Sequence, residues 1–357
     1  MNENDGKPKI LVIGGGSGSS NILRGLKLYP VDLTVIVTMF DSGGSSGLLR
    51  KEFGYPPFGD LRQCLMALSD DSQDTLRLIE ALEFKFGTES SLKGHSVGNL
   101  LLAALTSLSD NLEIALSDIS RLLGVTGQVV PVTLETAELC AELDDGRLIV
   151  GESDIDLRST PLPRIKRIFL NRDVEANPRA VQAILDADAI VFGPGDLYTS
   201  VLPNTLPKGI TDAVAATQGI RIYMCNLMTK QGETDGFKAS DFAGAMTSYL
   251  GPGNLDWAIV NTAAPTAAIA KAYEGEGAEF VNPDLDEVGR HVKGIIAMSL
   301  ATNGLPYRHD PDRTAAAIFQ ALEAGRVEGQ FNGCVSSLQS LERLVRIGRK
   351  VGKRATA

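Results

Sequence analysis

Hydrophobic residues along this chain fall into short continuous runs that alternate with stretches of helical spacing. The continuous runs predict buried strands at 9–13, 33–38, 189–192, 221–225 and 257–261. Apolar residues at helical spacing predict helices at 20–29, 60–68, 74–86, 100–105 and 178–185. The segment 100–105 is apolar on all sides, which is typical of a buried helix. Strands that alternate with helices indicate a three-layer α/β fold with a mostly parallel sheet.

The pattern changes between residues 126 and 170. Short apolar segments at 128–133 and 137–143 suggest strands, and the Asp-Asp-Gly sequence at 144–146 predicts a hairpin turn before a strand at 147–150. We therefore expect a β-rich insertion at about 126–170.

The insertion is expected to lie within one domain of residues 1–325. Residues 326–357 are predicted to form a basic helical extension, because six basic residues with interleaved apolar ones lie between Arg343 and Arg354. Such a helix either forms a solvated face or contacts an acidic partner.

Composition narrows the class of protein. The formal net charge of −10 argues against nucleic acid and anionic membranes as partners. The four cysteines show no paired spacing, so we expect buried free thiols and neither zinc nor haem. The start of the chain has no apolar signal segment, and no apolar run approaches about 20 residues. A soluble cytoplasmic protein without membrane insertion is expected, and the sequence allows a homo-oligomer.

Two glycine- and serine-rich loops, at 14–20 and 41–47, follow the first two predicted strands. Glycine frees backbone N–H groups and serine adds hydroxyl donors, so such a loop at a helix start suits an anion. In the first loop the candidate pyrophosphate ligands are Gly14, Gly15, Gly16, Ser17 and Gly18. In the second, the candidates for a further phosphate or a sugar hydroxyl are Gly43, Gly44, Ser45 and Ser46. Tight or mobile turns without a ligand are the alternative.

The first loop fits the dinucleotide-binding fingerprint imperfectly. Ser19 or Asn21 stands where its third glycine belongs, although Asp41 lies where a ribose-binding carboxylate is expected. We therefore expect a Rossmann-like fold with different ligand chemistry and no NAD, and a nicotinamide-dependent oxidoreductase is only a third hypothesis. Loops at 193–200 and 226–236 also follow predicted strands. All four loops should converge on one crevice at the carboxyl ends of the strands.

Several segments together resemble the CofD/YvcK-like superfamily, and the matches run in order from about residue 9 to 325. They are Gly-Gly-Gly-Ser-Gly at 14–18, Asp-Ser-Gly-Gly-Ser-Ser-Gly at 41–47, Gly-Asp-Leu-Arg at 59–62, Gly-His-Ser-Val-Gly-Asn-Leu at 94–100, Gly-Pro-Gly-Asp-Leu-Tyr-Thr-Ser at 193–200, Asn-Leu-Met-Thr at 226–229, Gly-Glu-Thr-Asp-Gly-Phe at 232–237 and Arg-His-Asp-Pro at 308–311. The sequence departs from the family pattern at Ser42, Gln63 and Asp196, where aspartate, asparagine and serine are usual.

The resemblance implies one of two functions. The YvcK branch, whose signatures are closer, implies a UDP-sugar-binding protein that regulates carbon metabolism or cell-wall synthesis. The CofD branch implies a magnesium-dependent phosphotransferase, similar to 2-phospho-L-lactate transferase, that uses a nucleoside-diphosphate-linked donor. Either way the expected partner is a small nucleotide-linked molecule, and a bound Mg²⁺ is allowed.

Residues in the matching segments are the further site candidates. For nucleotide or phosphate binding they are Asp60, Arg62, His95, Asn99, Gly193, Gly195, Tyr198, Asn226, Thr229 and Arg308. Asp41 is the catalytic candidate: it could ligate Mg²⁺ or orient an attacking hydroxyl, or bind ribose without chemistry.

Three of these candidates, Asp60, His95 and Arg308, have a structural alternative. Asp60 could be only a helix cap and His95 only a structural histidine. Asn99 and Asn226 suit a base edge or a sugar, and Tyr198 could stack on a base. Arg308 suits phosphate, and the family places a UDP-sugar-binding arginine there, but a surface salt bridge is the alternative.

Overall fold

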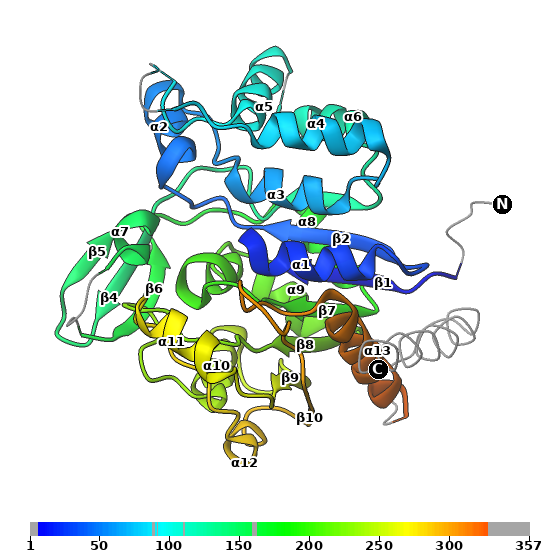
Figure 1. Cartoon of the computed structure of the whole chain (residues 1–357), viewed down its shortest axis with the longest axis vertical. Helices are drawn as coiled ribbons and strands as arrows, with labels where there is room; N and C mark the ends of the chain where they lie inside the picture. The colour runs from blue at the N-terminus through cyan, green and yellow to red at the C-terminus, as the bar shows by residue number, and fades with distance from the viewer. Residues whose placement is uncertain (1–5, 88–89, 91, 110, 159–162, 328–357) are drawn as a thin grey trace.

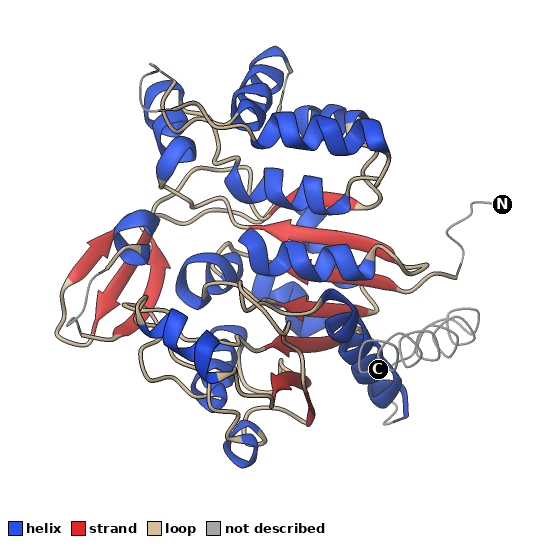
Figure 2. Cartoon of the chain, viewed as in Figure 1, coloured by secondary structure: helices blue, strands red, loops and turns tan. Residues whose placement is uncertain are grey.

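The computed structural model describes residues 6–327 except 88–89, 91, 110 and 159–162. A seven-stranded parallel sheet forms its centre, in the order β10-β9-β8-β7-β1-β2-β3 (Figures 1 and 2). The strands are β1 (Lys9–Ile13), β2 (Asp32–Val37), β3 (Gln128–Pro131), β7 (Ala189–Phe192), β8 (Ile220–Met224), β9 (Trp257–Asn261) and β10 (Gly294–Met298). β7 and β9 are buried along their whole length, which explains their continuous apolar runs.

Helices cover both faces of this sheet, and the predicted three-layer α/β fold is confirmed. The helices are α1 (Gly16–Leu26), α2 (Gly44–Phe53), α3 (Gly59–Leu68), α4 (Gln73–Glu83), α5 (Val97–Leu108), α6 (Leu112–Leu122), α7 (Glu152–Asp156), α8 (Pro178–Asp186), α9 (Ile210–Ala216), α10 (Ala239–Leu250), α11 (Ala267–Glu274), α12 (Leu285–Val288) and α13 (Pro311–Val327). In Figure 1, α1 lies in front of the sheet with α3 and α13 beside it, and α8 and α9 lie behind.

A separate three-stranded antiparallel sheet forms the β-rich insertion, in the order β5-β4-β6. Its strands are β4 (Leu139–Leu143), β5 (Leu148–Val150) and β6 (Ile165–Leu170), and the expected hairpin turn at 144–146 joins the first two. The expected start of the insertion at about 126 is wrong. Residues 128–131 form β3, which pairs in parallel with β2 at the edge of the main sheet, so the second sheet begins only with β4.

The prediction that α5 is a buried helix is also wrong. Within this helix only Gly98, Asn99, Leu102 and Ala103 are buried, and the side chain of Leu108 is 85% exposed. α5 packs mainly against α4 and α6, and its exposed residues are Ala104, Ser107 and Leu108.

Three of the four cysteines, Cys64, Cys140 and Cys225, are buried free thiols, as predicted. Cys334 and most of the predicted basic extension lie outside the described residues. Among the helices that the structure describes, none combines the length and apolar character that crossing a membrane requires.

Candidate functional site

Two adjoining clefts open where the parallel strands end. The first cleft has a volume of about 570 Å³ and lies between the start of α1, α7, the end of α11 and the loops that follow β7 and β8. The second, of about 410 Å³, lies between α1, α3 and the segment after α4. Ser17, Asn21 and Arg308 line both clefts, so the two spaces meet beside the first turns of α1. This edge of the sheet is where open α/β folds bind ligands.

The loop after β1 packs against Asp60 of α3. A Cβ atom on Gly15 would overlap Oδ2 of Asp60, so this close approach requires glycine. The carboxylate of Asp60 accepts a hydrogen bond from the backbone N–H of Gly16. Burial, aided by the negative charges of Asp41 and Asp196, raises the pKa of Asp60 to about 7. The backbone N–H of Gly16, which the sequence predicts as a donor to a ligand phosphate, therefore already donates to Asp60.

Only two of the five candidates in the first loop line a cleft. Ser17 and Gly18 line the first cleft, and Ser17 also lines the second. Gly14, Gly15 and Gly16 line neither cleft. Gly14 lies next to Ser19, as a Cβ atom there would come 2.6 Å from the Ser19 hydroxyl oxygen.

The second glycine–serine loop is held by a chain of polar contacts instead of facing either cleft. The hydroxyl of Ser45 lies 2.8 Å from Nδ1 of His95 and accepts a hydrogen bond of 3.2 Å from the Asn99 amide. Asn99 in turn accepts one of 3.1 Å from Nε of Arg62. Gly43, Gly44 and Ser45 line neither cleft, and the side chain of Ser46 lies outside what the structure describes. Candidates from three separate segments are thus brought together as one network.

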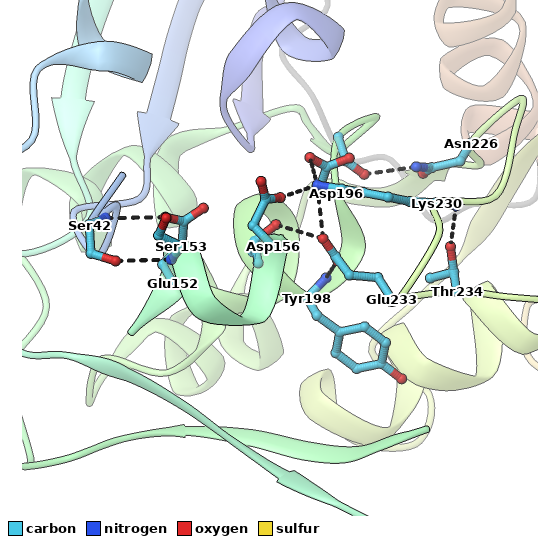
Figure 3. Close-up of polar contacts among 12 residues, drawn as sticks. Ser42, Glu152, Ser153, Asp156, Asp196, Tyr198, Asn226, Lys230, Glu233 and Thr234 are labelled. Atoms are coloured by element: carbon cyan, nitrogen blue, oxygen red, sulfur yellow. Dashed lines mark hydrogen bonds and ion pairs between the residues drawn. The ribbon is translucent and has the colours of Figure 1, made fainter. Parts of the chain in front are cut away.

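Ser42 connects this loop to the insertion (Figure 3). Its hydroxyl accepts a hydrogen bond of 2.9 Å from the backbone N–H of Ser153, and its own N–H donates one of 3.1 Å to Glu152. Both partners belong to the first turn of α7, where free N–H groups need an acceptor. Ser42, which stands where aspartate is usual, therefore still supplies an oxygen that caps this helix.

Asp41 lies against Glu152, and their carboxyl groups share a hydrogen bond. Burial and the Asp41 charge raise the pKa of Glu152 to about 8, although the Ser42 N–H opposes this change. Asp41 also accepts a hydrogen bond of 2.8 Å from the backbone N–H of Gly43. The catalytic candidate is therefore one half of a pair of carboxyl groups.

Lys230, in the loop after β8, lies among three carboxylates from three different segments (Figure 3). Its Nζ contacts Asp156 of α7, lies 2.6 Å from Asp196 and lies 3.0 Å from Glu233. Burial alone would lower the pKa of Lys230, but the three carboxylates raise it above its usual value. The negative charge that Asp196 brings to the first cleft is thus partly neutralised by an ion pair.

Glu233 organises the loop that follows β7. Its carboxylate accepts hydrogen bonds from the backbone N–H of Tyr198, at 3.2 Å, and from the hydroxyl of Thr199, at 3.1 Å. Burial raises its pKa to about 7, although Lys230 opposes this. The ring of Tyr198 packs edge-on against Phe237, with ring centroids 6.4 Å apart, and is 6% exposed. It does not line the first cleft, so the suggestion that it stacks on a base is not supported by this arrangement.

Gly195, Asn226 and Thr229 line the first cleft, whereas Gly193 does not. The polar groups of Asn226 and Thr229 already have protein partners. The Asn226 amide donates to the carbonyl of Gly195 at 2.9 Å, and the Thr229 hydroxyl accepts the N–H of Glu279 at 2.8 Å. These two side chains shape the wall of the cleft by fixing the loops that form it.

The opposite wall of the first cleft carries Arg308, Tyr273 and Tyr307. The hydroxyl of Tyr273 accepts a hydrogen bond of 3.0 Å from the N–H of Tyr307, which ties α11 to the segment that bears Arg308. The neighbouring His309 contacts the carbonyl of Cys225 at 3.1 Å through Nε2, and burial lowers its pKa to about 4. A neutral histidine thus anchors this segment to the end of β8, beside an exposed arginine.

Comparison with known proteins agrees with the motifs around these clefts. Residues 10–301 match the family model described as 2-phospho-L-lactate transferase CofD. The chain belongs to the CofD family. Curated relatives include the gluconeogenesis factor of Bacillus subtilis, which is 40% identical over 320 residues and is matched over 89% of this chain and 99% of its own. A putative gluconeogenesis factor of Nostoc sp. is 42% identical over 318 residues, covering 88% of this chain and 68% of the relative.

The fold of this CofD family member has a solved counterpart. A crystal structure of a Bacillus halodurans protein superposes with a TM-score of 0.82 at 38% identity, covering 89% of this chain and 99% of that chain. The resemblance drawn from the motifs, and the fold expected from it, are therefore both confirmed.

Several residues at the clefts of this CofD family member were not candidates from sequence. Lys230 and Glu233 lie within or beside the matching segment 226–237, so their position in that motif was an available signal. Asp156 and the tyrosines Tyr273 and Tyr307 have no comparable signal, because they lie outside the glycine-rich loops and come together only through the fold.

Proposed function

We propose that this protein binds a nucleotide-sugar of the UDP-sugar class in the first cleft and acts as a regulator of the gluconeogenesis-factor type, in carbon metabolism or cell-wall synthesis. The names of its relatives support the regulatory role. The position of Arg308 at the junction of the two clefts supports the ligand class.

Arg308 is the observation on which this proposal mainly rests. Among the described residues its guanidinium has no hydrogen-bond or ion-pair partner, although its backbone N–H bonds to Thr302. A guanidinium binds phosphate through two parallel hydrogen bonds. Tyr273 beside it offers aromatic surface for a base, and the carboxylates around Lys230 can accept sugar hydroxyls.

Calorimetric titration tests the proposal with UDP-N-acetylglucosamine, UDP-glucose, GDP, GTP and NADP, each with and without Mg²⁺. We expect UDP-sugars to bind without a Mg²⁺ requirement. Arg308→Ala should weaken this binding at least tenfold, or about 1.4 kcal/mol. The matched control is Arg77→Ala, an exposed arginine on α4 that lines neither cleft. Absence of UDP-sugar binding would contradict the proposal, and normal binding by Arg308→Ala would contradict the role of that residue.

A magnesium-dependent phosphotransferase is the second candidate, and the Asp41–Glu152 pair favours it. Once the proton of their shared hydrogen bond is displaced, these two carboxylates are a donor set that Mg²⁺ accepts, and the bound ion would stabilise charge on a transferring phosphoryl group. The carboxylates of Asp156, Asp196 and Glu233 fit the ion less well, because the Lys230 ammonium lies among them. Binding of GDP that requires Mg²⁺ and is lost in Asp41→Asn would support this candidate over the first.

A further inference from the structure

The second cleft differs from the first in its charge. Four basic side chains line it: Arg24 of α1, Arg62 of α3, Lys85 after α4, and Arg308 before α13. Glu83 is the one carboxylate on its wall. Each basic residue comes from a different segment, so the fold and not a local charge run brings them together.

These cations have no carboxylate partners within ion-pair distance. Among the described residues, Arg24, Lys85 and Arg308 form no side-chain hydrogen bond or salt bridge, and Arg62 contacts only Asn99 and Met66 with its guanidinium. Lys230 in the first cleft, by contrast, has three carboxylates around it. In a chain of net charge −10, four cations that face one space without ion pairs indicate a site for an anion.

Arg62 shows that the site is built into the fold. Its side chain is half-buried, its Nε donates to Asn99, and its aliphatic stem packs against Gly98, where a Cβ atom would clash with Cδ. Burial lowers the pKa of Arg62, and the negative charge of Glu83 opposes this change. An anionic ligand in the cleft would stabilise the half-buried guanidinium further.

Neutral donors complete the lining. Ser17 and Asn21 come from the first turns of α1, where hydroxyl and amide groups can bind phosphate oxygens, whereas the Ser20 hydroxyl already donates to the carbonyl of Gly16. Because Ser17, Asn21 and Arg308 also line the first cleft, one ligand can extend across the junction.

We propose that the second cleft binds a phosphate or diphosphate group, and that Arg24 and Lys85 are binding residues for it. The group belongs either to the nucleotide-sugar of the proposed function, whose remainder occupies the first cleft, or to a separate phosphorylated molecule. Only the first of these alternatives rests on the proposed function.

Calorimetric titration with inorganic pyrophosphate tests the site without a nucleotide. We expect pyrophosphate to bind the wild-type protein, and the double variant Arg24→Gln/Lys85→Gln to bind it at least tenfold more weakly. The matched control Arg77→Gln/Lys51→Gln removes the same charges from exposed positions on α4 and α2 and should bind as the wild type does. Arg24 and Lys85 are exposed, so the variant should fold, and a thermal melt verifies this. No pyrophosphate binding by the wild type, or equal binding by the double variant, would overturn the proposal.

Competition identifies the source of the phosphate. If pyrophosphate and a UDP-sugar displace each other, and the double variant loses affinity for both, the group is the diphosphate of the nucleotide-sugar. If both bind together, the cleft takes a separate phosphorylated ligand. If UDP-sugars do not bind but pyrophosphate does, and requires Arg24 and Lys85, the proposed function fails and the anion site stands.

Discussion

The hydroxyl of Ser45 lies 2.8 Å from Nδ1 of His95, so the second glycine–serine loop is fastened to the segment that leads into α5. Asn99 donates to the same hydroxyl. A serine beside a histidine is also the arrangement of a nucleophile and its base. Neither residue lines the two clefts, however, and the contacts of Ser45 serve to hold the loop.

Ser45→Ala should therefore lower stability and leave ligand binding nearly unchanged. Loss of a half-buried hydrogen-bonded hydroxyl costs about 1 kcal/mol, and we expect affinity for UDP-sugars to stay within about twofold. Denaturant unfolding and calorimetry measure the two effects. Ser107→Ala, at an exposed position on α5, is the control and should change neither. Lost binding with unchanged stability would place Ser45 at the ligand instead.

Asp60→Asn should make the free energy of unfolding decrease less as pH rises. The pKa of Asp60 is raised from 3.8 to about 7, so the folded protein binds its proton more tightly than the unfolded chain does. The stability that this contributes is complete below pH 3.8 and is lost as pH rises to about 7. One pKa unit corresponds to about 1.4 kcal/mol, so the variant should gain a few kcal/mol relative to wild type across this range.

The measurement for Asp60 is urea unfolding at a series of pH values between 4 and 8. Asparagine can still accept the Gly16 N–H through its amide oxygen, so the loop should keep its shape. Asp74→Asn, at an exposed position in the first turn of α4, is the control. A constant difference between wild type and Asp60→Asn at all pH values would contradict the prediction.

Ser42→Ala should loosen α7 and with it the wall of the first cleft. The hydroxyl of Ser42 caps the Ser153 N–H, and loss of such a cap costs about 1 kcal/mol. Ser42→Thr keeps the hydroxyl and should restore most of the loss. Hydrogen exchange at the amide of Ser153 reports the effect directly. Equal exchange in wild type and Ser42→Ala would show that the cap contributes nothing.

Much of the fold follows from the apolar pattern because strands that are buried on both faces need continuous apolar runs. The β-rich sequence that follows β3 predicts that β3 belongs to the insertion, whereas its sheet partner β2 is almost a hundred residues earlier. The segment 100–105 of α5 is predicted to be buried because it is apolar on all sides. Local sequence does not report how much of that surface a neighbour covers.

The sequence predicts which loops form the site but not which contacts their side chains make. Glycine and serine at the strand ends indicate where the chain must turn. Arg308, a candidate from its motif, lines both clefts. Tyr198 lies in a cleft-forming loop, yet its ring packs toward Phe237, and no spacing rule gives that direction. The cations of the second cleft are single residues on four segments, so only tertiary structure reveals their common position.

Lys230→Met should destabilise the protein more than the other substitutions do. It removes the ammonium group that forms ion pairs with Asp156, Asp196 and Glu233, and Glu233 is fully buried. Breaking a buried ion pair costs about 3–5 kcal/mol, and because the Lys230 side chain is 30% exposed we expect about 2 kcal/mol. The loss should shrink as pH falls toward about 7. Lys230 lowers the pKa of Glu233, so in the variant this pKa lies above about 7, and a Glu233 that is already protonated needs no cation.

Two further measurements separate charge from packing at this position. Lys230→Met/Glu233→Gln removes one charge of each sign and should recover part of the lost stability at pH 8, as measured by urea unfolding. Lys230→Met also leaves three carboxylates with no ammonium group among them, and one oxygen from each lies within 4.8 Å of the others. Mg²⁺ should therefore stabilise this variant and not the wild type. Equal instability of the single and double variants, with no response to Mg²⁺, would mean that Lys230 acts through the packing of its side chain.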